Sequence, residues 1–165
     1  MNLKTIEDQL FQPLGLSCSN IEEDLECREY SGFNCVVNSW NIKFRISKIT
    51  PTKTGQFVTI WKRNKKGETA PFDITDNVDF YLVASFKDNL SGIFIFPKRI
   101  LLEKGILSDG KKTGKRGIRV YPTWDKTESK QAQKTQDWQT QYFLEFSKDQ
   151  DEVLQQARLL LALLI

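Results

Sequence analysis

Cationic side chains that can bind phosphate are concentrated in two stretches of this chain of 165 residues. Residues 30–67 contain eight lysines and arginines and no acidic residue, and residues 98–121 contain eight more against Glu103 and Asp109. Residues 21–29, by contrast, hold five acidic residues, and the formal net charge of the whole chain is only +3. Because uniformly solvated surfaces mix the two signs of charge, this segregation predicts a polyanionic partner or a charged groove.

Several other kinds of chemistry are excluded because the chain lacks the residues, or the spacing of residues, that they require. It has no histidine, which removes Ser-His-Asp and Cys-His catalysis and histidine-metal nucleases. Its three cysteines match no zinc spacing, so buried or unreactive thiols are expected rather than a structural disulfide. Residues 105–111 fit the start of a phosphate-binding P-loop, but Lys112 stands where that motif needs Ser or Thr. The acidic loop 71–79 lacks the glycine and terminal glutamate of an EF-hand.

The stretch 42–63 predicts a rigid hairpin with positive charge on its outer face. From Ile42 to Ser47 apolar residues alternate with polar ones, which is the period of a half-buried strand. Pro and Gly within 50–55 favour a tight reversal, and residues 57–63 form the second strand. The hairpin and the second basic stretch supply the candidate phosphate contacts Arg45, Lys48, Lys53, Lys62, Arg63, Arg99, Lys115, Arg116 and Arg119.

Two aromatic residues at the end of the second basic stretch, Tyr121 and Trp124, are candidates for stacking on bases. The alternative for each ring is packing in the core, which is the commoner role of aromatic side chains. Since phosphate and aromatic bases occur together in nucleic acid, the predicted partner is DNA or RNA. Binding of this kind requires no cofactor.

The elements that position these residues alternate between helices and strands, which favours a single α+β domain over residues 1–165. The nearly continuous apolar run at 80–86 predicts a central strand covered on both faces. Helices are expected over 3–12, 19–30, 99–104 and 149–165, and residues 125–128 lead into a Gln-rich helix that runs to about residue 147. Further strands are expected over 33–37, 93–96 and 118–121.

Signals for export or for a membrane are not found in this sequence. The first residues lack the pattern of a signal peptide, and the longest apolar run, 159–165, is too short to span a bilayer. We therefore expect a cytoplasmic protein without a membrane partner. The helix 149–165 ends in that apolar run and is expected to pack on the sheet, with formation of a homodimer as the alternative.

Motifs along most of the chain resemble the MepB-like family of bacterial proteins. The sequence FRISKITPTKTGQFVTIWKR at 44–63 is followed by PFD, by GIFIFPK at 92–98 and by GKRGIRVYPTW at 114–124. Glu29-Tyr30 precedes them, and QDWQ and YF follow within 136–143. The resemblance is strongest over about 25–145. It implies a restriction-endonuclease-like fold of the PD-(D/E)XK type, in which helices flank a mixed β-sheet.

In that fold the core consists of a helix, three antiparallel strands, a helix and a strand. The resemblance places the three strands at 57–63, 80–86 and 93–96, the second helix after Lys98 and the last strand at 118–121.

The same resemblance implies catalytic roles for three residues. In such nucleases Asp79, at the start of the second core strand, would hold magnesium, Lys98 would supply the catalytic amine, and Glu29 would be an extra metal ligand. The third strand, 92–98, carries no carboxylate, although the motif requires one there. We therefore favour a nucleic-acid-binding protein without efficient catalysis. The alternatives are a magnesium-dependent nuclease and a non-catalytic protein-interaction module that uses the acidic segment 21–29 and the last helix.

Overall fold

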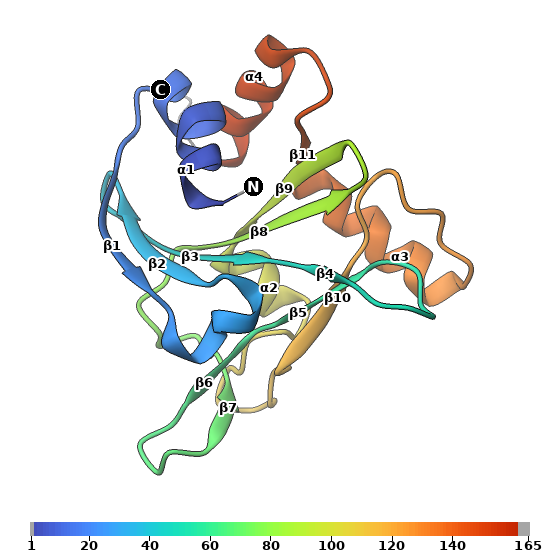
Figure 1. The fold of residues 1–165 in the computed structure, drawn as a ribbon. Helices are drawn as coiled ribbons and strands as arrows, with labels where there is room; N and C mark the ends of the chain where they lie inside the picture. Colours follow the sequence, from blue (N-terminus) through green and yellow to red (C-terminus); the bar gives the residue numbers. More distant parts are fainter. Residues whose placement is uncertain (1, 162–165) are drawn as a thin grey trace.

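A six-stranded mixed sheet forms the centre of the computed structural model, which describes residues 2–161 (Figure 1). Its strands are, in spatial order, β1 (Cys18–Glu23), β2 (Phe33–Val37), β3 (Trp40–Ile46), β8 (Phe80–Lys87), β9 (Leu90–Pro97) and β11 (Phe143–Glu145). All neighbours are antiparallel except β3 and β8, which run parallel. The chain is therefore an α+β protein with a mixed sheet, as the alternation of elements predicted.

Two smaller sheets and short helices complete the fold. A three-stranded sheet has the order β10 (Gly117–Val120), β5 (Gln56–Thr59) and β4 (Lys48–Ile49), and β6 (Trp61–Arg63) pairs with β7 (Thr69–Pro71). The α-helices are α1 (Leu3–Ile6), α2 (Lys98–Glu103), α3 (Lys130–Gln139) and α4 (Gln150–Leu160). Shorter helical segments are the π-helical η1 (Glu7–Phe11) and the 3-10 segments η2 (Gln12–Leu14), η3 (Leu25–Tyr30) and η4 (Thr140–Tyr142).

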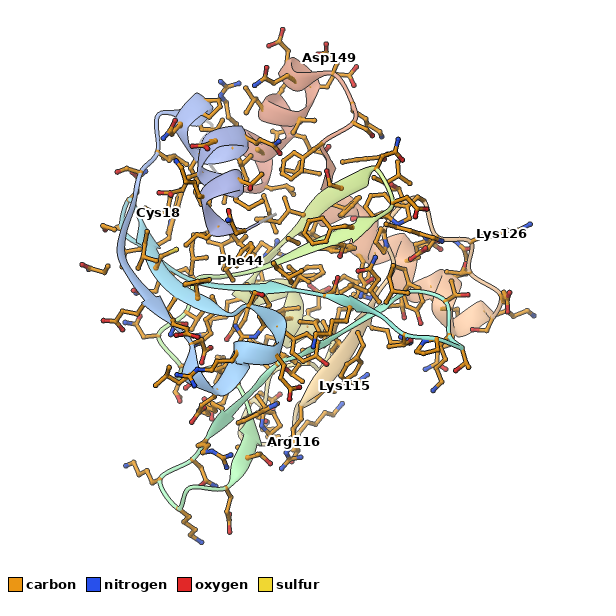
Figure 2. All side chains as sticks on the ribbon, viewed as in Figure 1. Cys18, Phe44, Lys115, Arg116, Lys126 and Asp149 are labelled. Carbon is orange, nitrogen blue, oxygen red and sulfur yellow. The ribbon has the colours of Figure 1, made fainter. Side chains whose placement is uncertain are left out.

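The central strand β8 separates two hydrophobic cores. Leu82 and Ala84 pack with α1, η1 and α4 on one face, whereas Tyr81 and Val83 pack on the other face, where α2 and the three-stranded sheet lie. Phe44, on the neighbouring β3, is fully buried near the middle of the molecule (Figure 2). Because successive side chains of a strand point to opposite faces, a continuous apolar run is required where both faces are covered. The prediction of a central strand at 80–86 is confirmed.

Long-range strand pairing replaces part of two predicted helices. The helix expected over 19–30 is wrong in its first half, because residues 18–23 form β1 and pair with β2. The Gln-rich helix expected to run to about residue 147 ends earlier, as α3 and η4, and Phe143–Glu145 pair with β9 at the edge of the sheet. The pairing of β1 with β2 brings the Sγ atoms of the free cysteines Cys18 and Cys35 to 3.8 Å from each other.

The basic stretch 42–63 does not form one hairpin. Its first strand stays in the large sheet as β3, and the chain leaves that sheet at Ser47, whose hydroxyl contacts Gln56 and Ser85. Only the short β4 pairs with β5 across the turn.

The nuclease-like core placed on this chain is also wrong in one strand. The segment 57–63 does not lie beside β8, because β5 pairs with β4 and β10 in the separate sheet, and the predicted last strand, 118–121, is that β10. The short helix after Pro97 and the left-handed Gly105 that follows it are found as predicted.

The C-terminal helix packs on its own domain. Val153, Leu154 and Ala157 of α4 are buried in the same core as α1. The end of the leucine-rich run, residues 162–165, lies outside the described residues, so a homodimer through it stays a prediction. Within residues 2–161, none of the helices is long and apolar enough to cross a membrane.

Candidate nucleic-acid interface

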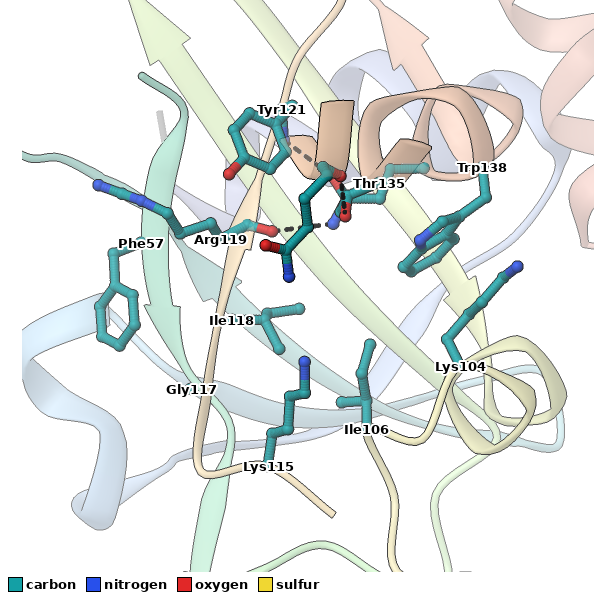
Figure 3. Close-up of a pocket in the computed structure, with 12 residues that line it drawn as sticks. Phe57, Lys104, Ile106, Lys115, Gly117, Ile118, Arg119, Tyr121, Thr135 and Trp138 are labelled. Atoms are coloured by element: carbon teal, nitrogen blue, oxygen red, sulfur yellow. Dashed lines mark hydrogen bonds between the residues drawn. The ribbon is translucent and has the colours of Figure 1, made fainter. Parts of the chain in front are cut away.

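Two pockets that share lining residues meet at the three-stranded sheet, along its edge strand β10, and together form a groove. One has a volume of about 400 Å³ and the other about 380 Å³, and both are lined by Phe57 and Arg119. Figure 3 shows the larger pocket between β10, α3 and the end of α2. We call the two pockets together the basic groove. Its lining is Thr50, Thr52, Lys53, Phe57, Lys104, Ile106, Lys115, Gly117, Ile118, Arg119, Tyr121, Gln131, Thr135, Trp138 and Gln139.

The register of the small sheet places a row of three side chains along the groove. Along β10, Ile118 and Val120 are buried in the core, so Arg119 points to the opposite face. Arg119 is paired with Phe57 of β5, and Phe57 is paired on its other side with Lys48 of β4. Residues that are directly opposite in a sheet share a face and lie within contact distance. The row is therefore one aromatic ring between two cations.

Arg119 has unsatisfied hydrogen-bonding capacity. Its Nη2 donates to the hydroxyl of Thr50, but its Nη1 is buried and has no hydrogen-bond partner. None of the ion pairs found within residues 2–161 involves Arg119, and neither pocket is lined by a carboxylate. A buried polar group without a partner costs about 1–3 kcal/mol, and more when it is charged.

Helix α3 fixes the position of β10. The buried Gln139 accepts a hydrogen bond from the backbone N–H of Tyr121 (2.8 Å) and donates one to the carbonyl of Arg119 (2.9 Å), as Figure 3 shows. Lys115 extends into the larger pocket, and the Nζ of Lys104 lies 5.7 Å from the centre of the Trp138 ring. The groove is thus a rigid surface with cations at several points along it.

Comparison with known proteins relates this chain to one family. The family model described as MepB-like matches residues 24–145. The chain belongs to the MepB-like family. The crystal structure of MepB is similar to it, with 32% sequence identity and a TM-score of 0.79 over 89% of this chain and 95% of that one. Among curated proteins, the search found no match. The family resemblance predicted from the motifs is confirmed.

Four of the predicted contact residues line the basic groove of this MepB-like chain. They are Lys53, Lys115, Arg119 and Tyr121. Lys48 borders the groove, because it is exposed and is the strand neighbour of Phe57, and its Nζ lies 4.8 Å from the ring centre of Tyr30.

Arg45 is a correction to the predicted contacts, because it lies inside the protein. Its side chain is 3% exposed, and its Nη2 donates to the carboxylate of Asp24 at 3.0 Å. Lys43 shares the same carboxylate at 3.6 Å, and burial lowers the pKa of this lysine below its usual value. Arg45 therefore serves as a structural ion-pair partner, since both faces of β3 are covered.

Four other predicted cations are engaged with protein groups outside the groove. Lys62 forms a 2.7 Å ion pair with Asp76, and Arg63 and Arg99 lie within 4 Å of Glu26 and Glu103. Arg116 turns away from its neighbour Lys115 and donates to the carbonyl of Thr69 (Figure 2). Trp124 is also a correction, because its ring packs edge-on against the core residue Phe143, with centroids 5.5 Å apart.

Sequence patterns missed several residues that line the groove. Phe57 was assigned to a strand and Lys104 to a short helix, but neither was assigned to a site. Gln131, Thr135 and Trp138 lie on a helix whose aromatic residues were assigned to the core. The groove brings together segments that are far apart in the sequence, so no local spacing could have revealed it.

The three predicted catalytic residues do not form one centre in this MepB-like chain. Asp79 and Lys98 lie close through their backbones, since the Lys98 N–H donates to the Asp79 carbonyl at 3.0 Å. However, the Lys98 amine donates to the carbonyl of Asp76 at 2.5 Å, and Glu29 lines a separate pocket beside Arg63. No three acidic or cysteine side chains among residues 2–161 are grouped to hold a metal ion.

We expect Asp79 to have a local structural role. Its carboxylate accepts a hydrogen bond from the backbone N–H of Asn41 at 2.8 Å, which joins the starts of β3 and β8. Asp79→Ala should therefore lower the free energy of unfolding by about 1 kcal/mol, measured by urea denaturation. Millimolar magnesium should shift the melting temperatures of the wild type and the variant equally. A magnesium-dependent stabilisation that only the wild type shows would instead identify Asp79 as a metal ligand.

Proposed function

We propose that this protein binds nucleic acid through the basic groove, with Lys53, Lys115 and Arg119 contacting phosphates. The observation that carries this proposal is a groove lined by Lys53, Lys104, Lys115 and Arg119 and by no carboxylate. Guanidinium groups form paired hydrogen bonds with phosphate oxygens, so a phosphate in the groove would supply the anionic partner that Arg119 lacks among residues 2–161.

The composition of the groove favours nucleic acid over other polyanions. The cations alone would be sufficient to bind an acidic peptide or an inorganic anion, and neither ligand would require aromatic side chains. The groove also presents Phe57, Tyr121 and Trp138 among these cations, and aromatic rings between positive charges are typical of surfaces that bind the bases and backbone of nucleic acid. Binding of this kind requires neither a metal ion nor a nuclease-like scaffold.

The proposed activity is binding without efficient catalysis. A magnesium-dependent nuclease would need at least two carboxylates near the scissile phosphate. The groove lining offers none, and Asp79 and Glu29 are both outside it. Lys98 is also outside the groove, with its amine hydrogen-bonded to Asp76.

The test is a fluorescence-anisotropy titration of labelled DNA and RNA oligonucleotides at low ionic strength. We expect saturable binding that is tighter than about 1–100 µM, since that is the range of sequence-independent binding at physiological salt and lower salt strengthens it. The affinity should be the same in EDTA and in magnesium, and the oligonucleotides should remain intact. Absence of binding to every oligonucleotide would refute the proposal, whereas cleavage that requires magnesium would support the nuclease alternative.

A further inference from the structure

We propose that Phe57 is a stacking platform for an unpaired base, so that the basic groove selects single-stranded over double-stranded nucleic acid. This inference rests on the proposed function and adds the class of ligand to it. Three observations carry it: the isolation of Phe57 from the core, its position between two cations, and the two pockets that it lines.

Phe57 is a large aromatic side chain that does not belong to the hydrophobic core. It is half-buried and is a member of neither core cluster, although Val58, the next residue, is fully buried. Its one aromatic neighbour within the described residues is Tyr30, which meets it edge to face with centroids 6.3 Å apart. Part of its ring surface is therefore free of core contacts, and a ligand is the available partner for that surface.

The ring of Phe57 is held in place by the small sheet. It lies over Gly117 of β10, where a Cβ atom would come within 2.4 Å of the Phe57 Cζ. The absence of a side chain at Gly117 allows the ring to lie across the strand. Arg119 flanks the ring on one side and Lys48 on the other. A ring between two cations matches a nucleotide strand, in which each base is flanked by phosphates.

The space next to Phe57 fits a single base. The two pockets that meet at this ring have volumes of about 400 and 380 Å³, close to the lower limit for small-molecule sites. Ile106 and Ile118 line the larger pocket from the core-facing side of β10, and the exposed Gln131 of α3 also lines it. The side-chain amide of Gln131 can donate to and accept from the edge of a base.

Duplex nucleic acid cannot use this platform. In a duplex the faces of the bases are stacked on each other inside the helix, so a ring that lies within a sheet cannot reach them. A duplex would contact only the cations. The proposed platform therefore predicts tighter binding of a single strand than of a duplex of the same length, at equal salt.

The experiment compares two variants with three oligonucleotides of one length. Phe57→Leu keeps an apolar side chain but removes the ring, and Phe57→Tyr keeps the ring. We expect Phe57→Leu to weaken the binding of a single strand about tenfold, within the usual range for one base–aromatic stack, and to leave duplex binding unchanged. Phe57→Tyr should bind like the wild type. Single strands that carry abasic sites should bind the wild type about as weakly as the intact strand binds Phe57→Leu.

The possible outcomes distinguish failure of the stacking platform at Phe57 from failure of the basic groove as the binding site. Equal salt-dependent binding of single strand, abasic strand and duplex by the wild type would overturn the platform and leave the basic groove as the binding site. Failure of all three oligonucleotides to bind the wild type would overturn both proposals. The abasic strand is tested with the wild-type protein. The role of base stacking can therefore be measured even if Phe57→Leu does not fold.

Discussion

Replacement of Asp24 with alanine should lower the free energy of unfolding by about 3–5 kcal/mol, which is the usual cost of leaving a buried charge without its partner. Asp24 accepts from the Arg45 guanidinium at 3.0 Å, in a site where the arginine side chain is 3% exposed. It also caps η3 by accepting from the backbone N–H of Glu26. Urea denaturation monitored by circular dichroism measures the change.

A matched control and a double variant test this interpretation. Glu23→Ala removes the neighbouring surface pair with Arg28, whose side chains are 53% and 65% exposed, and should change stability by no more than about 0.5 kcal/mol. Asp24→Leu combined with Arg45→Met removes both charges of this pair and should recover part of the loss, since Lys43 still loses the carboxylate that it shares. If Asp24→Ala cost less than about 1 kcal/mol, the buried Arg45 would not depend on this carboxylate.

The double variant Lys115→Ala/Arg119→Ala should bind nucleic acid at least about 100-fold more weakly than the wild type at low salt. Each residue removed is a charged donor, and a hydrogen bond to a charged group contributes about 1.5–3 kcal/mol. Both side chains line the larger pocket, so their removal should not expose the core. Fluorescence anisotropy with the same single-stranded oligonucleotide measures both affinities.

The control for this effect is Lys65→Ala/Lys66→Ala. It makes the same change in net charge on the turn between β6 and β7, whose two lysines are exposed and line neither pocket of the groove. We expect at most a few-fold loss of affinity from it, because the exposed charges are screened by salt. Equal losses in the two double variants would mean that net charge, rather than the groove, governs binding.

The sequence predicted the parts of the fold that depend on local pattern. The apolar run of β8 and the left-handed Gly105 after α2 are examples, because a buried strand and a helix end each have a local signature. The strands β1 and β11 were missed because each depends on pairing with a distant strand, β2 or β9. Tertiary pairing of this kind overrides helix propensity.

The candidate site was predicted in part for the same reason. Charge segregation was sufficient to select Lys53, Lys115 and Arg119, which line one groove. Charge segregation could not distinguish these residues from Arg45. The partner of Arg45 is Asp24, which lies in the acidic segment 21–29, and the sequence does not show that this segment contacts a basic stretch. The role of Phe57 depends on the register of β4, β5 and β10, which sequence alone does not give.

The salt dependence of binding tests the central claim most directly. Lys48, Lys53, Lys104, Lys115 and Arg119 lie in or beside the groove. If all five contact phosphates, the logarithm of the association constant should fall with the logarithm of salt concentration with a slope of about −3.5 for a single strand. The slope for Lys115→Ala/Arg119→Ala should be shallower by about 1.4. An unchanged slope in that variant, or no salt dependence in the wild type, would contradict binding of nucleic acid through the basic groove.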